Sequence, residues 1–290
     1  MSPSSATPTP TPRPPPAPAP APPQAGTPAP AGRPARDLRS RITAVTSGKG
    51  GVGKTFISAN LAAALARAGR RVLVLDADLG LANLDVVLNL FPKVTLHDVF
   101  TGRCSLNDAI LPAPGRFDVL LAGSGMVEYS RMTTEVRDQL LQVIADVAPR
   151  YDHVLLDTGA GISDVVLFTV SLAGQVLIVA TPEPTSMTDA YATIKVLAAT
   201  QGRRQVSLVV NQVRRPGEGR SVRTQLQQVV DRYVSPELDT PLTLELLGEV
   251  PSDPAVREAV LRRQLLMEVM PGTPAAIGIV GVATRLLGAG

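Results

Sequence analysis

Residues 47–55 read SGKGGVGKT, and this stretch decides the fold. It fits the pattern G-x-x-x-x-G-K-[ST] and lies between a short β-branched run at 42–46 and an alanine-rich segment at 54–68. A strand before the pattern and a helix after it form the context in which this motif binds phosphates. Its glycines let the backbone approach an anion closely, where a Cβ would clash or forbid the backbone angles. The sequence therefore predicts a phosphate-binding loop.

The side chains that carry chemistry in this loop are lysines and a threonine. We expect Lys54 to neutralise β- and γ-phosphate oxygens and the Thr55 hydroxyl to bind Mg²⁺. Of the 28 basic residues only four are lysines, and two of these, Lys49 and Lys54, lie in the loop. Backbone N–H groups of the loop and of the following helix point at the anion. The expected nucleotide contacts are Gly48, Lys49, Gly50, Gly51, Val52, Gly53, Lys54, Thr55 and Phe56.

Carboxylates follow two predicted strands at the point where each strand ends. Asp76 and Asp78 come after the run RVLVL (71–75), and Asp157 comes after HVLL. Ligands of parallel sheets bind beyond the carboxyl ends of the strands, so these acids are expected beside the phosphate loop. Asp157 has the position of a Walker B acid, which holds Mg²⁺. Asp76 and Asp78 are two residues apart and share one side of an extended chain, so one can order the metal shell while the other orients the attacking water.

Apolar runs and helical segments alternate along the rest of the chain. The apolar runs are buried on both faces, which is typical of a parallel sheet covered by helices on both sides. We predict an α/β fold of the P-loop NTPase kind, a doubly wound, mostly parallel sheet. The predicted strands are 42–46, 71–75, 118–121, 153–156, 176–180, 206–210 and 244–249. The predicted helices are 54–68, 134–147, 186–199, 219–233 and one from 254 to about 266, with Asp253 as N-cap and Pro254 at its first position.

Composition separates a leader from the domain. Residues 1–36 hold 14 of the 27 prolines, three arginines and no acid, and we expect them to be disordered with polyproline character. The predicted ATPase domain is 37–290, in which basic and acidic residues balance. This balance disfavours DNA binding, although the arginine pairs 203–204, 214–215 and 262–263 leave a DNA-binding role open.

The single cysteine and the C-terminal segment limit the function further. Cys104 alone cannot supply the thiolates of an iron–sulfur carrier, and it excludes an internal disulfide framework. Without disulfides or a secretory signal, the expected location is the cytoplasm. At the C-terminus, apolar residues such as Ile277, Ile279 and Val280 fall on several sides of a helix, which favours packing on the domain over insertion in a membrane surface.

Several segments resemble the MinD/ParA family of dimerising ATPases. SGKGGVGKT (47–55) has the lysine directly after the first glycine that marks the deviant Walker A motif of that family, and DADLGLANLD (76–85) is similar to the MinD switch region. The resemblance is closest to the flagellar-number regulators, the FlhG/FleN group. It rests on YDHVLLDTGAGIS (151–163), TPEPTSMTDAYATIKVL (181–197), LLAGSGM (120–126) and EVPSDPAVREAV (249–260).

The resemblance implies roles for individual residues. Lys49 would reach across an ATP-bound homodimer to the partner's phosphates, and Asp78 would activate water. Asp76 and Asp157 would complete the Mg²⁺ site with Thr55. The remaining implied positions are Asn211 as the residue that reads adenine, Pro251 and Asp253 as walls of the same pocket, and Asp189 in switch and dimer contacts.

The implied function is an ATPase that controls the number or placement of flagella, with ATP promoting the dimer and hydrolysis releasing it. The alternatives within the family are a ParA-type DNA-partitioning ATPase and a MinD-type ATPase of the cell-division site. Implied partners are a flagellar transcription regulator or a signal-recognition-like GTPase, but GRPARDLRSRITAV (32–45) lacks the short motif used for that GTPase. Weak contact with the inner membrane or the cell pole stays open.

Overall fold

The computed structural model describes residues 38–80, 82–123 and 132–288. The leader predicted at 1–36 lies outside them. The apolar run before the phosphate loop forms β1 (Ile42–Ser47), and all six of its side chains are buried. The loop leads directly into α1 (Lys54–Arg67), whose small side chains allow it to pack closely against the sheet.

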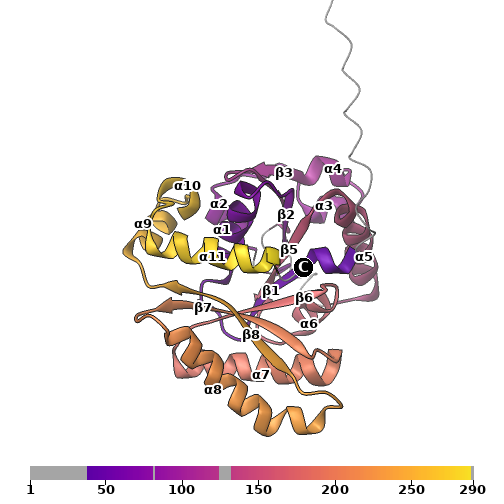
Figure 1. Ribbon diagram of the computed structural model, residues 1–290. Coiled ribbons are helices and arrows are strands. Elements are labelled where there is room, and N and C mark those ends of the chain that lie inside the picture. The colour runs from indigo at the N-terminus through magenta and orange to yellow at the C-terminus, as the bar shows by residue number, and fades with distance from the viewer. Residues whose placement is uncertain (1–37, 81, 124–131, 289–290) are drawn as a thin grey trace, which may run out of the picture. The chain divides into compact units, whose positions relative to one another are not determined.

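Eight strands form one sheet in the order β3-β4-β2-β5-β1-β6-β7-β8 (Figure 1). Neighbouring strands are parallel except β3 and β4, which form an antiparallel hairpin. This is the predicted fold, a doubly wound P-loop NTPase sheet with the phosphate loop at the end of a central strand. The other strands are β2 (Val72–Ala77), β3 (Ile110–Ala113), β4 (Phe117–Leu120), β5 (His153–Ala160), β6 (Gln175–Ala180), β7 (Gln205–Val213) and β8 (Thr243–Pro251).

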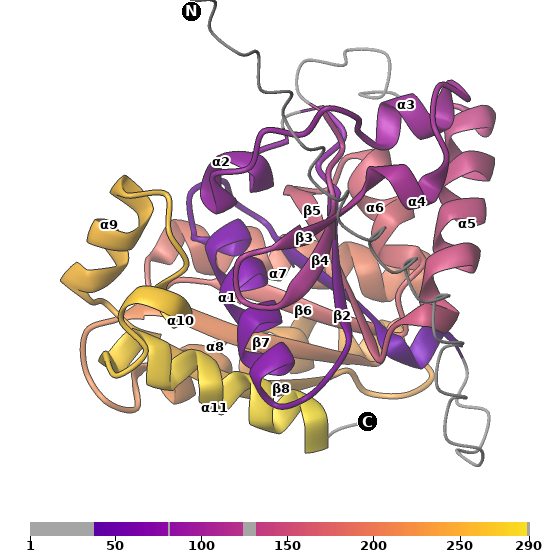
Figure 2. The ribbon, with the colours of Figure 1, turned by 90° about the horizontal axis from the view of Figure 1, so that it is seen from above.

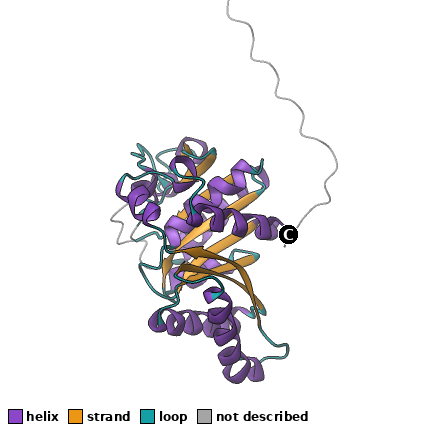
Figure 3. Ribbon diagram, turned by 60° about the vertical axis from the view of Figure 1, so that its left-hand side comes forward, coloured by secondary structure: helices purple, strands orange, loops and turns teal. Residues whose placement is uncertain are grey.

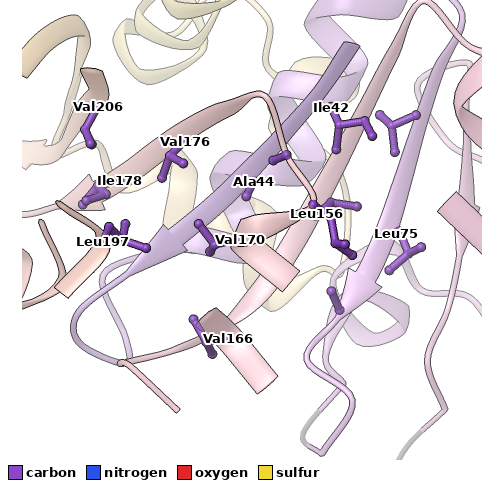
Figure 4. Packing of buried hydrophobic residues seen from close by; sticks show 14 of the residues in the cluster. Ile42, Ala44, Leu75, Leu156, Val166, Val170, Val176, Ile178, Leu197 and Val206 are labelled. Carbon is purple, nitrogen blue, oxygen red and sulfur yellow. The ribbon is translucent and has the colours of Figure 1, made fainter. Parts of the chain in front are cut away.

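Helices cover both faces of the sheet, and Figure 2 shows α1 and α5 on opposite sides. Successive strand residues point to opposite faces, so Ala44 packs in one apolar cluster and Val45 in the other. The first cluster lies against α3 (Leu96–Phe100), α4 (Leu106–Ala109), α5 (Thr134–Val147), α6 (Asp164–Ser171), α7 (Pro184–Gln201) and α8 (Glu218–Tyr233). Part of it is drawn in Figure 4, where Ala44, Leu156 and Val170 lie between strands and helices. The second cluster lies against α1, α2 (Leu84–Leu88), α9 (Pro254–Leu261), α10 (Leu266–Val269) and α11 (Pro274–Gly288).

Two local features differ from the sequence prediction. Strand β3 was not predicted, because Ile110–Ala113 is short and contains Pro112, which is tolerated only at a sheet edge. The helix expected from 254 to about 266 ends at Leu261, and Arg263 then adopts the left-handed conformation with φ 52°. A separate short helix, α10, follows. The predicted cap is confirmed, because the Asp253 side chain accepts a hydrogen bond from Ala255 N at 2.9 Å.

The C-terminal helix α11 packs on the domain, as predicted. Its residues Ile279, Val282 and Leu286 are buried against the sheet and α1, whereas Ile277 and Val280 are exposed. Among the described residues, no helix combines the length and the apolar character that a bilayer crossing requires.

The edge strand β8 is covered by polar side chains from the neighbouring helices. Gln227 of α8 accepts a hydrogen bond from Leu244 N at 2.8 Å and donates one to Leu242 O at 2.8 Å. Arg223 of α8 donates to Leu244 O, and Arg285 of α11 donates to Leu247 O. An open edge would offer these backbone groups to another strand, so the side chains protect the sheet from edge-to-edge pairing. Figure 3 shows the strands between the helices on either side.

We expect Gln227→Ala to lower the free energy of unfolding by about 1–2 kcal/mol, because it leaves a backbone N–H and C=O of the sheet edge without partners. Urea unfolding followed by circular dichroism measures the change. Gln228→Ala is the matched control, since Gln228 is the exposed neighbour of Gln227 on α8. Equal losses in both variants would show that the edge contacts of Gln227 are not responsible, since the helix propensity of alanine would by itself stabilise either variant.

Candidate nucleotide-binding site

The phosphate loop has the backbone that its glycines predict. Gly51 and Gly53 have φ of 80° and 89°, in the region that side chains disfavour. A Cβ on Gly53 would also lie 2.5 Å from the amide nitrogen of Asn211, and one on Gly48 would collide with the backbone carbonyl of Asp189. In contrast, a Cβ on Gly50 or Gly51 would meet nothing within 4 Å. The loop is therefore packed tightly at its two ends and open in the middle, which leaves its backbone N–H groups accessible to an anion.

Lys54 points into the domain and forms a buried ion pair with Asp157. Its Nζ lies 3.0 Å from Asp157 Oδ1, and the two side chains are 9% and 2% exposed. The same carboxylate oxygen accepts a hydrogen bond from Ser58 Oγ at 2.8 Å. Ser58 was not predicted as a site residue, although it lies four residues after Lys54 and hence on the same face of α1. The structure thus brings the Walker A lysine and the predicted Walker B acid together.

Asp76 lies beside Asp157 on the neighbouring strand, in direct register. Its oxygens accept hydrogen bonds from Asp78 N at 3.2 Å and Leu84 N at 3.3 Å, so it also fixes the chain that follows β2. Burial, reinforced by the charge of Asp157, raises the pKa of Asp76 to about 8. Asp78 is partly exposed and lies next to Gly159, where an added Cβ would be 3.4 Å from Oδ1. Asp78 follows β2, but Asp76 and Asp157 lie within β2 and β5, because both strands run further than the predicted ends at 75 and 156. The three predicted acids still gather toward the carboxyl ends of these two adjacent strands.

Lys49 is at the surface, and its side chain turns away from the buried acids. Its Nζ donates to Thr185 Oγ1 at 3.0 Å and lies 3.3 Å from Glu183 Oε2, at the start of α7. The Lys49 side chain is 39% exposed. Neither Glu183 nor Thr185 was predicted as a Lys49 partner, because they lie more than 130 residues away in sequence. The two loop lysines thus have different environments, one inside the domain and one on its surface.

Asn211 links β7 to the phosphate loop. Its Nδ2 donates to Val52 O at 2.8 Å, and its Oδ1 accepts from Gln212 N at 2.9 Å. The amide also has a second N–H and a second oxygen lone pair, although the residue is only 6% exposed. The predicted role in reading adenine is compatible with this geometry.

The remaining predicted residues have clear structural positions. Asp253 accepts hydrogen bonds from Ala255 N and, at 3.2 Å, from Ala275 N, so it joins the starts of α9 and α11. Pro251 ends β8 beside it. Phe56 is buried in an apolar cluster, so only its backbone is available to a nucleotide. The contribution of these residues to an adenine pocket stays a prediction.

The donors present fit Mg²⁺ and a triphosphate. Two buried carboxylates, Asp76 and Asp157, lie side by side, and Lys54 pairs with Asp157. Burial, and after it the charge of Asp157, raises the pKa of Asp76. Mg²⁺ is usually held by one or two carboxylates or hydroxyls together with phosphate oxygens and water. Thr55 at the start of α1 would supply the hydroxyl. The bound ion would neutralise phosphate charge, and the fold and the site together define a P-loop nucleoside triphosphatase.

Comparison with known proteins identifies the family. The model of the CobQ/CobB/MinD/ParA nucleotide binding domain matches residues 43–266. The antiactivator FleN of Pseudomonas aeruginosa is 42% identical over 246 residues, which are 85% of this chain and 86% of FleN. The flagellum site-determining protein YlxH of Helicobacter pylori is 34% identical and covers 80% of this chain and 76% of its own. The septum site-determining protein MinD of Pyrococcus horikoshii OT3, complexed with Mg-ADP, has a TM-score of 0.66 at 30% identity, covering 85% of this chain and 95% of that one.

The chain belongs to the MinD/ParA family, because the family model matches well over half of it. It is an ATP-hydrolysing P-loop ATPase that uses ATP and Mg²⁺. Flagellar regulators and cell-division ATPases are among its relatives.

Proposed function

We propose that the protein is an ATP-dependent switch that regulates the number or placement of flagella. ATP promotes a homodimer, each Lys49 acts on the nucleotide of the partner, and hydrolysis releases the dimer. The observation that carries the proposal is the surface position of Lys49, which turns outward to Glu183 and Thr185 while Lys54 pairs with Asp157 inside. Because the Lys49 ammonium group lies at the rim of the phosphate loop, it can reach a nucleotide that is bound to the partner chain of a homodimer.

A cross-dimer lysine couples assembly to chemistry. A second cation on the γ-phosphate stabilises charge in the transition state, and the same contact stabilises the dimer. ATP and ADP then favour different assembly states, which is the differential affinity that a switch needs. In this scheme Asp78 orients the attacking water, and Thr55, Asp76 and Asp157 hold the metal.

The flagellar role is supported by similarity to FleN and YlxH, whose names describe an antiactivator and a flagellum site-determining protein. We propose that the ATP-bound dimer acts through a flagellar transcription regulator or a signal-recognition-like GTPase. It would work in the cytoplasm, at the inner membrane or the cell pole. The packing of α11 on the domain disfavours a role for this helix as a membrane anchor, because its apolar side is buried against the sheet.

Asp78→Ala is expected to slow phosphate release about a hundredfold or more, because the water loses its orienting acid. ATP should still dimerise this variant, as measured by light scattering with saturating ATP and Mg²⁺. Asp146→Ala, an exposed acid on α5, is the charge-matched control. Unchanged phosphate release would remove Asp78 from the mechanism, and a variant that stays monomeric with ATP would overturn the switch.

Deleting the gene tests the biological role. Flagella counted by electron microscopy should become more numerous or misplaced, while chromosome inheritance in the same cells stays normal. Chromosome loss with normal flagella would overturn the flagellar role and favour the DNA-partitioning alternative.

A further inference from the structure

A second concave site lies where β2, β4 and β5 begin, at the opposite end of the strands from the phosphate loop. It is a pocket of about 340 Å³ lined by Arg70, Arg71, Arg116, Arg150 and a few neighbours. Arg71 directly precedes β2, Arg116 precedes β4, and Arg150 lies just before β5. These strands are parallel, so the pocket is at their starting ends, whereas Asp76 and Asp157 lie at the other ends. We call it the arginine pocket.

Three separate chain segments bring positive charge to the arginine pocket. They are the turn between α1 and β2, the hairpin turn between β3 and β4, and the 3₁₀ turn Ala148–Arg150. Among the lining residues these four arginines meet one carboxylate, Asp118, which accepts a hydrogen bond from Tyr151 Oη at 2.8 Å. A second carboxylate, Asp152, lies outside the lining and pairs with Arg71 at 3.2 Å. The lining of the pocket therefore carries a net positive charge.

Two of these guanidinium groups have unused donors. The Nε of Arg70 is buried and has no hydrogen-bond partner among the described residues. A buried donor without an acceptor costs about 1–3 kcal/mol, which a shift of the Arg70 side chain toward a bound acceptor would remove. Arg116 forms no hydrogen bond or ion pair within the described part of the chain. Its φ of 65° belongs to the hairpin turn between β3 and β4, where positive φ is common.

We propose that the arginine pocket binds a small molecule that carries a phosphate group. Guanidinium forks match phosphate oxygens in pairs of hydrogen bonds. A phosphate monoester carries close to two negative charges at neutral pH, whereas a carboxylate carries one, so a phosphate suits a lining of net positive charge better. The volume lies in the range of small-molecule sites. The site differs from the phosphate loop in using side chains instead of backbone N–H groups.

Equilibrium dialysis with radiolabelled pyrophosphate tests the proposal. The full chain is first saturated with Mg²⁺ and ADP, so that the phosphate loop is filled. The wild type should then bind one pyrophosphate per chain. Arg70→Gln/Arg116→Gln should weaken this binding at least about tenfold, because two charge-assisted hydrogen bonds are lost. Urea unfolding of both proteins checks that the variant keeps its fold.

Arg262→Gln/Arg263→Gln is the matched control, because it removes the same charge from an exposed pair after α9. It should bind pyrophosphate like the wild type. Equal weakening in both double variants would show a long-range charge effect and overturn the proposal. Wild-type protein that binds no pyrophosphate once ADP is saturating would overturn it as well, as would binding of duplex DNA but not of pyrophosphate through Arg70 and Arg116.

Discussion

Replacing Lys54 by alanine is expected to lower the free energy of unfolding by about 3–5 kcal/mol in nucleotide-free buffer. Lys54 is the cation that compensates Asp157, and both side chains are almost completely buried. Its removal leaves the Asp157 charge in the interior next to Asp76, with only the Ser58 hydroxyl as a hydrogen-bonding partner on that oxygen. Urea unfolding monitored by circular dichroism gives the difference directly.

The double variant Lys54→Ala/Asp157→Asn separates charge burial from packing. It removes both charges, so most of the lost stability should return, even though ATP hydrolysis does not. Lys195→Ala on the exposed face of α7 is the control for a lysine without a buried partner, and it should unfold like the wild type. If the double variant were as unstable as Lys54→Ala, lost packing of the lysine side chain would explain the effect instead of the unpaired acid.

The elements around this pair could be predicted because each has a strong local signal. The strand before the phosphate loop is β-branched and buried at every position, and the residues before Asp157 are a continuous apolar run. A sheet covered on both faces buries such strands completely. Parallel strands end at one edge, so the meeting of Lys54 with Asp157 follows from the fold class. The same reasoning places Asp76 beside Asp157, which the register confirms.

Other parts of the site depend on contacts that a linear sequence does not encode. The partners of Lys49 come from the start of α7, and no spacing rule connects residues 49 and 183. Asp253 was expected at the adenine pocket, yet its oxygens also join two helix starts, one of them 22 residues later. Strand β3 is only four residues long and contains Pro112, and it forms because it pairs with β4 in an antiparallel hairpin. The arginine pocket likewise combines three turns that are far apart in the chain.

Lys49→Ala is expected to reduce the turnover number for ATP about 10²–10³-fold, the usual effect of removing one preorganised group that stabilises transition-state charge. ATP binding should persist, because Lys54 and the loop backbone are untouched. Phosphate release and nucleotide affinity measured in parallel distinguish these effects. The control is again Lys195→Ala, which removes a lysine outside the loop.

Mixing Lys49→Ala with Asp78→Ala chains tests whether the lysine acts across the dimer. In a mixed dimer, the Lys49→Ala chain keeps its own Asp78 and receives the partner's Lys49, so one of the two sites is complete. With equal amounts of the two chains, about a quarter of the wild-type rate should return, because half of the dimers are mixed and each has one working site. If Lys49 acted within its own chain, neither site would be complete, and mixing two nearly inactive proteins would restore nothing.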